Sequence, residues 1–138
     1  MRTITSIILH CTATFPGQSV TIADITRWHR QRGFTTIGYH YVIDTDGSVL
    51  NGRPIADVGA HCRHHNANSI GIAYIGGLDI HGTPTDTRTP EQNEALIKLL
   101  QELRQQFPAA TIVGHNQLNP AKACPAFDVQ QWLKQVNL

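Results

Sequence analysis

The chain has 138 residues, of which 41% are hydrophobic, and its 11 basic and 10 acidic side chains leave a formal net charge of +1. This length and apolar content predict a single domain, residues 1–138, with one core. The balanced charge argues against binding to nucleic acid, and the lack of an apolar run of ~20 residues argues against insertion into a membrane.

Short apolar runs alternate with amphipathic helical patterns along the chain. In order, the sequence predicts a strand at 4–9, a helix at 22–32, a hairpin of strands at 38–43 and 49–51, a loop at 53–68, a strand at 69–75, a helix at 90–107, a strand at 111–114 and a helix at 129–136. Thr21 and Thr89 each precede a helix in a capping-box pattern. This alternation predicts an α/β fold, in which one domain has a central mixed β-sheet flanked by helices.

Two segments raise specific expectations about side chains. In the strand at 38–43, the period of two puts Tyr39 and Tyr41 on the same face. The loop at 53–68 has no periodicity and carries His61, so it is a candidate rim for a substrate. Cys62 lies in the same loop, where we expect an exposed thiol without a role.

Two predicted strands end next to a histidine. The strand at 4–9 leads to His10, and the strand at 111–114 leads to His115, with Cys124 nine positions later (124 − 115). If these strands are neighbours, two imidazoles and one thiol converge, and they are three of the four ligands of tetrahedral zinc. Three protein ligands leave one position open for water or substrate. The pattern therefore predicts a catalytic zinc site.

The cysteine count supports a ligand role rather than disulfide bonds. Three cysteines are an odd number, and no secretory signal pattern is visible at the start of the sequence, so we expect synthesis in the cytosol. Cys11 follows His10 directly, and its side chain should point to the opposite face of the strand. We expect Cys11 to be a buried, inert thiol.

Short motifs occur in a fixed order along nearly the whole chain. They are Leu9–Thr14, Trp28–His29, Gly38–His40, Asp46–Gly47, Gly52–Arg53, Val58–His61, Asn68–Gly71, Gly76–Gly77, Thr89–Pro90, Pro120–Pro125 and Phe127–Asp128. The series resembles the type-2 N-acetylmuramoyl-L-alanine amidases, which include the amidase-type lysozymes of T-seven-like phages and the peptidoglycan recognition proteins. The resemblance implies that family's fold and hydrolysis of the amide between N-acetylmuramic acid and L-alanine in peptidoglycan.

The resemblance also implies roles for individual residues. The implied ligands of one Zn²⁺ ion are His10, His115 and Cys124. Tyr39 and Lys122 fall on the family's catalytic tyrosine and lysine positions, where Lys122 would stabilise a developing oxyanion and Tyr39 would donate to it or orient the attacking water. His61 matches the family's loop histidine and is implied to contact glycan or peptide. The implied partner is peptidoglycan, and we expect a monomer.

Two other functions remain open at this point. Cys124 as nucleophile with His115 as base would make a cysteine-dependent cell-wall peptidase, although this leaves His10 without a role. A non-catalytic peptidoglycan-binding module is the other, although such a module has no need of the thiol. A cytosolic amidase must also reach the wall after release. The first explanation is a phage or prophage endolysin, and the second is a secreted toxin.

Overall fold

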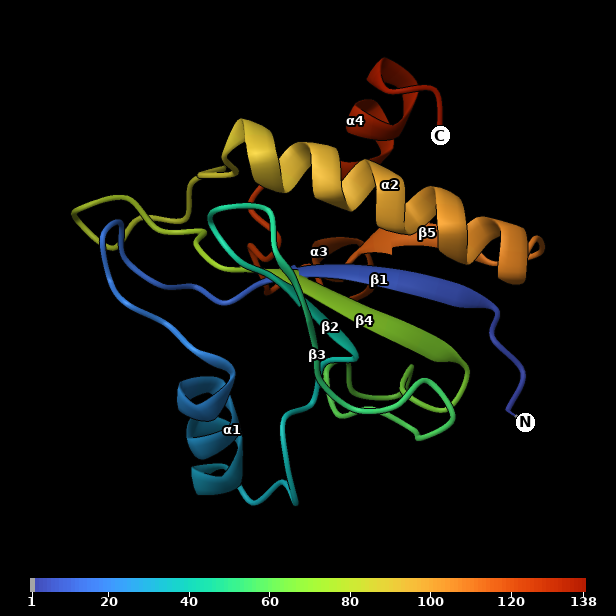
Figure 1. Ribbon diagram of the computed structural model, residues 1–138, viewed down its shortest axis with the longest axis horizontal. Coiled ribbons are helices and arrows are strands. Elements are labelled where there is room, and N and C mark those ends of the chain that lie inside the picture. The colour runs from blue at the N-terminus through green and yellow to red at the C-terminus, as the bar shows by residue number, and fades with distance from the viewer. Residues whose placement is uncertain (1) are drawn as a thin grey trace.

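The computed structural model describes residues 2–138, in which five strands form one mixed sheet (Figure 1). The strands are β1 (Ser6–Cys11), β2 (Tyr41–Ile43), β3 (Val49–Asn51), β4 (Ser69–Tyr74) and β5 (Thr111–Gly114). Their spatial order is β3-β2-β4-β1-β5, and every neighbouring pair is parallel except β2 with β3. The two strands that lead to the predicted histidine ligands are therefore neighbours, as the zinc prediction requires.

Within residues 2–138, four helices accompany the sheet: α1 (Ile22–Gln31), α2 (Pro90–Gln106), α3 (His115–Leu118) and α4 (Val129–Gln135). The helices α1 and α2 begin at capping boxes, because Thr21 and Thr89 each accept a hydrogen bond from the third helical backbone N–H. The predicted α/β fold is confirmed. The four-residue helix α3 was not predicted, since one turn is too short to show a period in the sequence.

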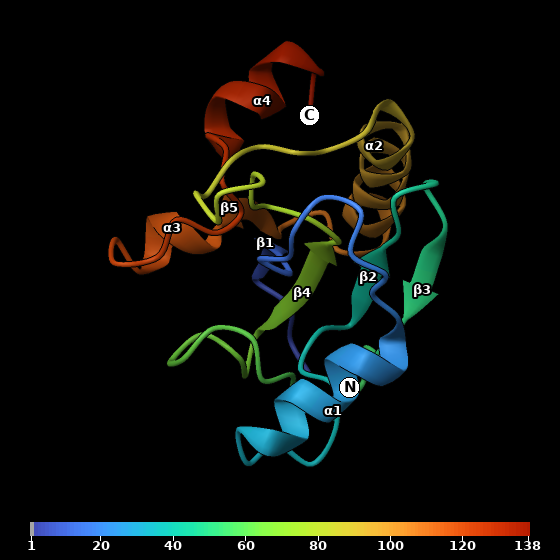
Figure 2. The same cartoon turned by 90° about the vertical axis from the view of Figure 1, so that its left-hand side faces the viewer.

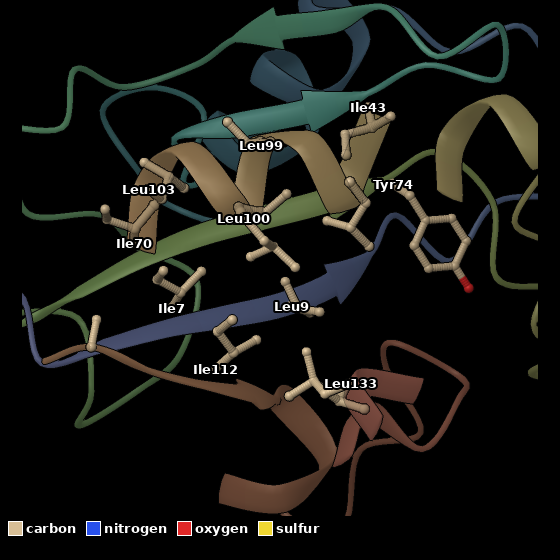
Figure 3. Packing of buried hydrophobic residues seen from close by; sticks show 14 of the residues in the cluster. Ile7, Leu9, Ile43, Ile70, Tyr74, Leu99, Leu100, Leu103, Ile112 and Leu133 are labelled. Carbon is tan, nitrogen blue, oxygen red and sulfur yellow. The ribbon is translucent and has the colours of Figure 1, made fainter. Parts of the chain in front are cut away.

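The two faces of the sheet are covered differently. The helices α2 and α4 lie on one side and α1 on the other (Figures 1 and 2). Branched side chains from the sheet pack against branched side chains from α2 and α4 (Figure 3). Among them are Leu9, Ile70, Leu100, Ile112 and Leu133. We call this side the apolar face. It contains most of the buried hydrophobic residues, so most of the hydrophobic stabilisation of the fold comes from it.

The side of the sheet toward α1 is called the imidazole face. In β4 the large Ile70 and Ile72 belong to the apolar face, so Ser69, Gly71 and Ala73 point toward the imidazole face. All three are completely buried or nearly so. Because they are small, other groups can approach the β4 backbone closely, and the loop between β3 and β4 does so.

Two predictions about single residues were wrong. Tyr41 packs with Ile43 on the apolar face, whereas Tyr39 packs with Val42 on the α1 side, because regular β structure begins only at Tyr41. Cys62 is buried, with 3% of its surface exposed, because its loop folds back and the backbone N–H of Cys62 donates to the Asn66 side chain. Cys11 is buried in the apolar cluster as predicted.

Within residues 2–138, no helix combines the length and the apolar character that crossing a bilayer requires.

Candidate metal centre

The first predicted ligand, His10, is near the end of the interior strand β1 and is 2% exposed. The neighbouring Leu9 packs on the apolar face, so His10 points to the imidazole face. Its Nδ1 atom lies 3.7 Å from the sulfur of Cys124. Its ring centroid lies 4.7 Å from that of His115. The structure therefore brings together the three residues that the sequence singled out.

The sulfur of Cys124 is held by the end of β1. Pairing between β1 and β5 ends at Leu9 and Gly114. The next backbone N–H on the β5 side of β1, that of Cys11, therefore has no partner on β5. It donates to Cys124 Sγ at 3.1 Å instead. A backbone donor of this kind stabilises negative charge on the sulfur. The strand end thus provides both a predicted ligand, His10, and a hydrogen bond to a second predicted ligand, Cys124.

His115 occupies the first position of α3, directly after β5. The backbone N–H of Asn116 donates to the Cys124 carbonyl at 2.8 Å, which ties the start of α3 to the segment that carries the thiol. The Tyr74 hydroxyl donates to the carbonyl of Pro125 at 2.7 Å and holds the same segment against β4. Contacts of the backbone and of Tyr74 therefore fix the positions of His115 and Cys124 relative to each other.

The three donors fit a zinc ion. The two imidazole nitrogens and the thiol sulfur all lie within 4.8 Å of one another. Tetrahedral zinc with Zn–N of about 2.05 Å and Zn–S of about 2.3 Å separates nitrogen and sulfur by about 3.6 Å. The separation of 3.7 Å between His10 Nδ1 and Cys124 Sγ agrees with this edge. Two histidines and one cysteine also match zinc in ligand type, and they leave its fourth position to water or substrate.

The environment sets the protonation of the ligands. Burial lowers the pKa of His10 well below its usual value, and burial together with the Lys122 charge lowers the pKa of His115. Both rings are therefore neutral and able to bind a metal at neutral pH. The hydrogen bond with the Cys11 side chain and burial raise the pKa of Cys124, and they outweigh the opposing effect of the Cys11 backbone N–H. Its thiol keeps its proton until a cation displaces it, so metal binding releases a proton.

Of the two predicted catalytic residues, Tyr39 lies beside this cluster and Lys122 acts on it through its charge. The ring centroid of Tyr39 lies 5.3 Å from that of His10, and burial raises the pKa of Tyr39, so its hydroxyl remains a hydrogen-bond donor. Lys122 lies in the exposed loop between α3 and Cys124. Its positive charge reaches the site, since it lowers the pKa of both His115 and Cys124. The catalytic roles of Tyr39 and Lys122 stay predictions.

His61, predicted to contact substrate, is half-buried beside His10. Its Nδ1 lies 2.9 Å from His10 Nε2, and its Nε2 lies 3.2 Å from the Ser69 hydroxyl. Both ring nitrogens thus have partners within the protein. Its contact with glycan or peptide stays a prediction.

Two other buried histidines have structural partners. His29 Nδ1 accepts a hydrogen bond from the backbone N–H of Gly38 at 2.8 Å, and His40 Nδ1 accepts one from Gly71 at 3.0 Å. The ring of His29 also packs edge to face on Tyr39. His29 and His40 therefore support the backbone around the site.

The sequence reasoning missed the residues that support the site from β4. A Cβ atom added at Gly71 would lie 2.5 Å from His61 Cγ, so only glycine lets the imidazole approach this strand. The available signal was the alternation of small and large residues over Ser69–Tyr74, because a glycine within a strand often marks a close approach.

Comparison with known proteins agrees with this geometry. A family profile described as N-acetylmuramoyl-L-alanine amidase matches residues 1–127. The endolysin of Escherichia phage T7 is 38% identical over 133 residues, which cover 96% of this chain and 87% of the endolysin.

Solved structures of two kinds share the fold. The N-acetylmuramoyl-L-alanine amidase LysC from Clostridium intestinale superposes with a TM-score of 0.85 at 28% identity, covering 99% of this chain and 87% of LysC. Drosophila PGRP-LB superposes with a TM-score of 0.76 at 25% identity, covering 91% of this chain and 76% of that one. Both the profile and the T7 relative span almost the whole length, and on this evidence the chain belongs to the N-acetylmuramoyl-L-alanine amidase family.

Proposed function

We propose that this chain is a zinc-dependent N-acetylmuramoyl-L-alanine amidase. It hydrolyses the amide bond between N-acetylmuramic acid and L-alanine in bacterial peptidoglycan. The observation that carries the proposal is the convergence of His10, His115 and Cys124 in a chain of the amidase family. The fold is built so that two parallel neighbours, β1 and β5, deliver the two imidazoles to the same end of the sheet.

The protein supplies a cationic site of moderate charge. Two neutral imidazoles and one thiolate would leave a bound Zn²⁺ with a formal charge of +1 (2 − 1). Zinc in such a site acts as a Lewis acid, which lowers the pKa of a bound water and polarises a carbonyl oxygen. Amide hydrolysis needs both effects, because resonance protects the carbonyl carbon and the reaction passes through an oxyanion.

Tyr39 and Lys122 act on the charge that develops during the reaction. The Tyr39 hydroxyl keeps its proton because burial raises its pKa, so its role is to donate a hydrogen bond rather than to act as a base. The Lys122 ammonium adds positive charge at the solvent side of the cluster. Preorganised groups of this kind stabilise an oxyanion without reorganising during the reaction.

The alternative with Cys124 as nucleophile has less support. A nucleophilic cysteine needs a lowered pKa, but the hydrogen bond with the Cys11 side chain and burial raise the pKa of Cys124. Among residues 2–138, none hydrogen-bonds to the His115 ring to orient it as a base. The fit of the donor set to zinc supports the metal-dependent reaction instead.

The endolysin relatives support a place in phage lysis. The T7 relative is named an endolysin, and its likeness extends over 96% of this chain. We therefore propose that the protein acts on the cell wall after release from a phage-infected or prophage-bearing cell. Delivery as a secreted toxin is the alternative.

The test is an assay on purified peptidoglycan sacculi. We expect new L-alanine amino termini, their loss after treatment with a chelator, and recovery when zinc is added back. The Cys124→Ser variant should be inactive, whereas the matched Cys62→Ala variant, which removes a buried thiol outside the metal cluster, should stay active. Cleavage that survives the chelator would indicate a thiol peptidase. Binding to sacculi that remain intact would indicate a recognition module.

A further inference from the structure

The two nitrogens of the His10 ring have different surroundings. Nδ1 is the nitrogen 3.7 Å from Cys124 Sγ and is therefore the one that faces the metal position. Nε2 points away from that position and lies 2.9 Å from Nδ1 of His61. The two rings stand at 90° to each other. His61 thus contacts a metal ligand through the nitrogen that the metal does not use.

His61 is fixed in this orientation on all sides. Its Nε2 lies 3.2 Å from the hydroxyl of Ser69, and its backbone N–H donates to the Asn66 side chain at 2.9 Å. The ring lies over Gly71 and beside Gly59, where an added Cβ would come within 2.5 Å and 2.8 Å of ring carbons. The imidazole therefore fits in this position because Gly59 and Gly71 have no side chains.

The chain from Ser69 through His61 to His10 can hold its protons in two ways. In one, His10 carries its proton on Nε2 and donates to His61, which in turn donates from its own Nε2 to Ser69. In the other, Ser69 donates to His61, His61 donates from Nδ1 to His10, and the His10 proton sits on Nδ1. A metal needs the lone pair of Nδ1, so only the first arrangement permits binding.

We propose that His61 is a positioning residue that holds the His10 proton on Nε2 and so keeps Nδ1 open to the metal, with Ser69 as the terminal acceptor. The inference rests on the proposed zinc site. It gives a role to a residue that is not itself a ligand, because both of its nitrogens are used elsewhere. Outer partners of metal-bound histidines typically contribute 10- to 100-fold to metal affinity.

The test is the zinc dissociation constant, measured by competition with a chromophoric chelator. We expect His61→Leu to weaken binding by about 10- to 100-fold. The His61→Asn variant should recover most of this loss, because its side-chain oxygen lies as many bonds from Cα as Nδ1 does and can accept the same proton. The exposed His81→Leu variant, which removes an imidazole from a different loop, should bind like the unchanged chain.

A second variant disturbs His61 without altering any polar group. Gly71→Ala places a methyl group against the His61 ring and should weaken zinc binding while all three ligands remain. For these variants, Co²⁺ replaces Zn²⁺ as a spectroscopic probe of the metal site. We expect its absorption bands to change in His61→Leu and Gly71→Ala but to remain in His61→Asn. Thermal unfolding of the metal-free variants identifies any that fail to fold.

The outcomes separate the inference from the proposed function. If the unchanged chain binds zinc but His61→Leu binds it within twofold of the same affinity, the positioning role is wrong. Equal losses in His61→Leu and His61→Asn would also overturn it, since packing rather than proton acceptance would then matter. If the unchanged chain binds no zinc, the proposed zinc site is wrong, and the positioning role of His61 is wrong with it.

Discussion

The two faces of the sheet are built from the same strands but differ in chemistry. On the apolar face, Leu9 and Ile70 pack against α2 and α4 in a continuous hydrophobic cluster. On the imidazole face, the residues next to them in sequence, His10 and Ser69, belong to a chain of hydrogen-bonded polar groups. Because successive side chains of a strand point to opposite faces, residues of the hydrophobic core alternate with residues of the polar site.

Because the polar site residues lie on a separate face of the sheet, they reduce the stability of the hydrophobic core little. Buried polar groups are expensive unless they are hydrogen-bonded, and every buried side-chain nitrogen or oxygen among residues 2–138 has a partner. The apolar face can therefore supply the stability that holds His10 and its neighbours in place. Mutations on the two faces should therefore affect different measurements: zinc binding and activity on the imidazole face, and stability on the apolar face.

The largest effect is expected from Cys124→Ser. A serine hydroxyl is a poor zinc ligand, so the variant should lose measurable zinc and measurable amidase activity together. The free energy of unfolding of the metal-free protein should change by less than ~1 kcal/mol, since Cys124 is only partly buried. Metal analysis and chemical denaturation provide the two measurements. Full zinc content in Cys124→Ser would contradict the ligand assignment.

A smaller loss of activity is expected from Lys122→Ala. The variant keeps all three ligands and should keep its zinc, but the rate of hydrolysis should fall by about 100-fold because a charge near the oxyanion is lost. Steady-state kinetics on a soluble peptidoglycan fragment should show the change in kcat. A variant that has lost its zinc would place Lys122 in the support of the metal rather than in catalysis.

On the apolar face, Leu100→Ala should affect stability and leave the chemistry alone. Leu100 is completely buried in α2, and truncation of such a side chain costs about 3 kcal/mol through lost burial and the cavity left behind. The folded variant should bind zinc with unchanged affinity below its unfolding temperature. A large change in zinc affinity would show that the two faces are energetically coupled.

The last prediction is a pH dependence that comes from the imidazole face. Burial lowers the pKa of His29 from 6.5 to about 4, so the unfolded chain binds a proton more readily than the folded one between these values. Stability should therefore fall with decreasing pH across this window, by up to about 1.4 kcal/mol per unit from this one residue.

The matched variant for this pH dependence is His29→Asn. It keeps an acceptor for the Gly38 N–H but cannot be protonated, so denaturation midpoints measured in chelator should fall less steeply below pH 6.5. Above pH 7 the two proteins should have similar midpoints. An unchanged slope in the variant would show that His29 does not carry this dependence.

The sequence could predict the elements whose signals are local. Strand and helix patterns, capping at Thr21 and Thr89, and the histidines at the ends of two strands all lie within a few residues of one another. The convergence of His10 with Cys124 needed one further condition, that β1 and β5 be neighbours, and the sheet order meets it.

The rest depended on contacts between distant residues. His61 and His10 are 51 positions apart, and nothing near either residue indicates that their rings meet. The face of the sheet on which the Tyr39 side chain lies was mispredicted. The period of two applies only within a regular strand, and β2 begins two residues after Tyr39. The burial of Cys62 depends on how its loop folds back, which composition alone does not determine.

The chain separation of the predicted ligands has a mechanical consequence. His10 and Cys124 are 114 positions apart (124 − 10), and the first belongs to the interior strand β1 while the second follows the edge strand β5. An ion held by both would act as a removable cross-link that joins the two ends of the polypeptide. At a free zinc concentration 1,000 times its dissociation constant, such a link would stabilise the folded state by about 4 kcal/mol, and a chelator would release that clamp without cutting a covalent bond.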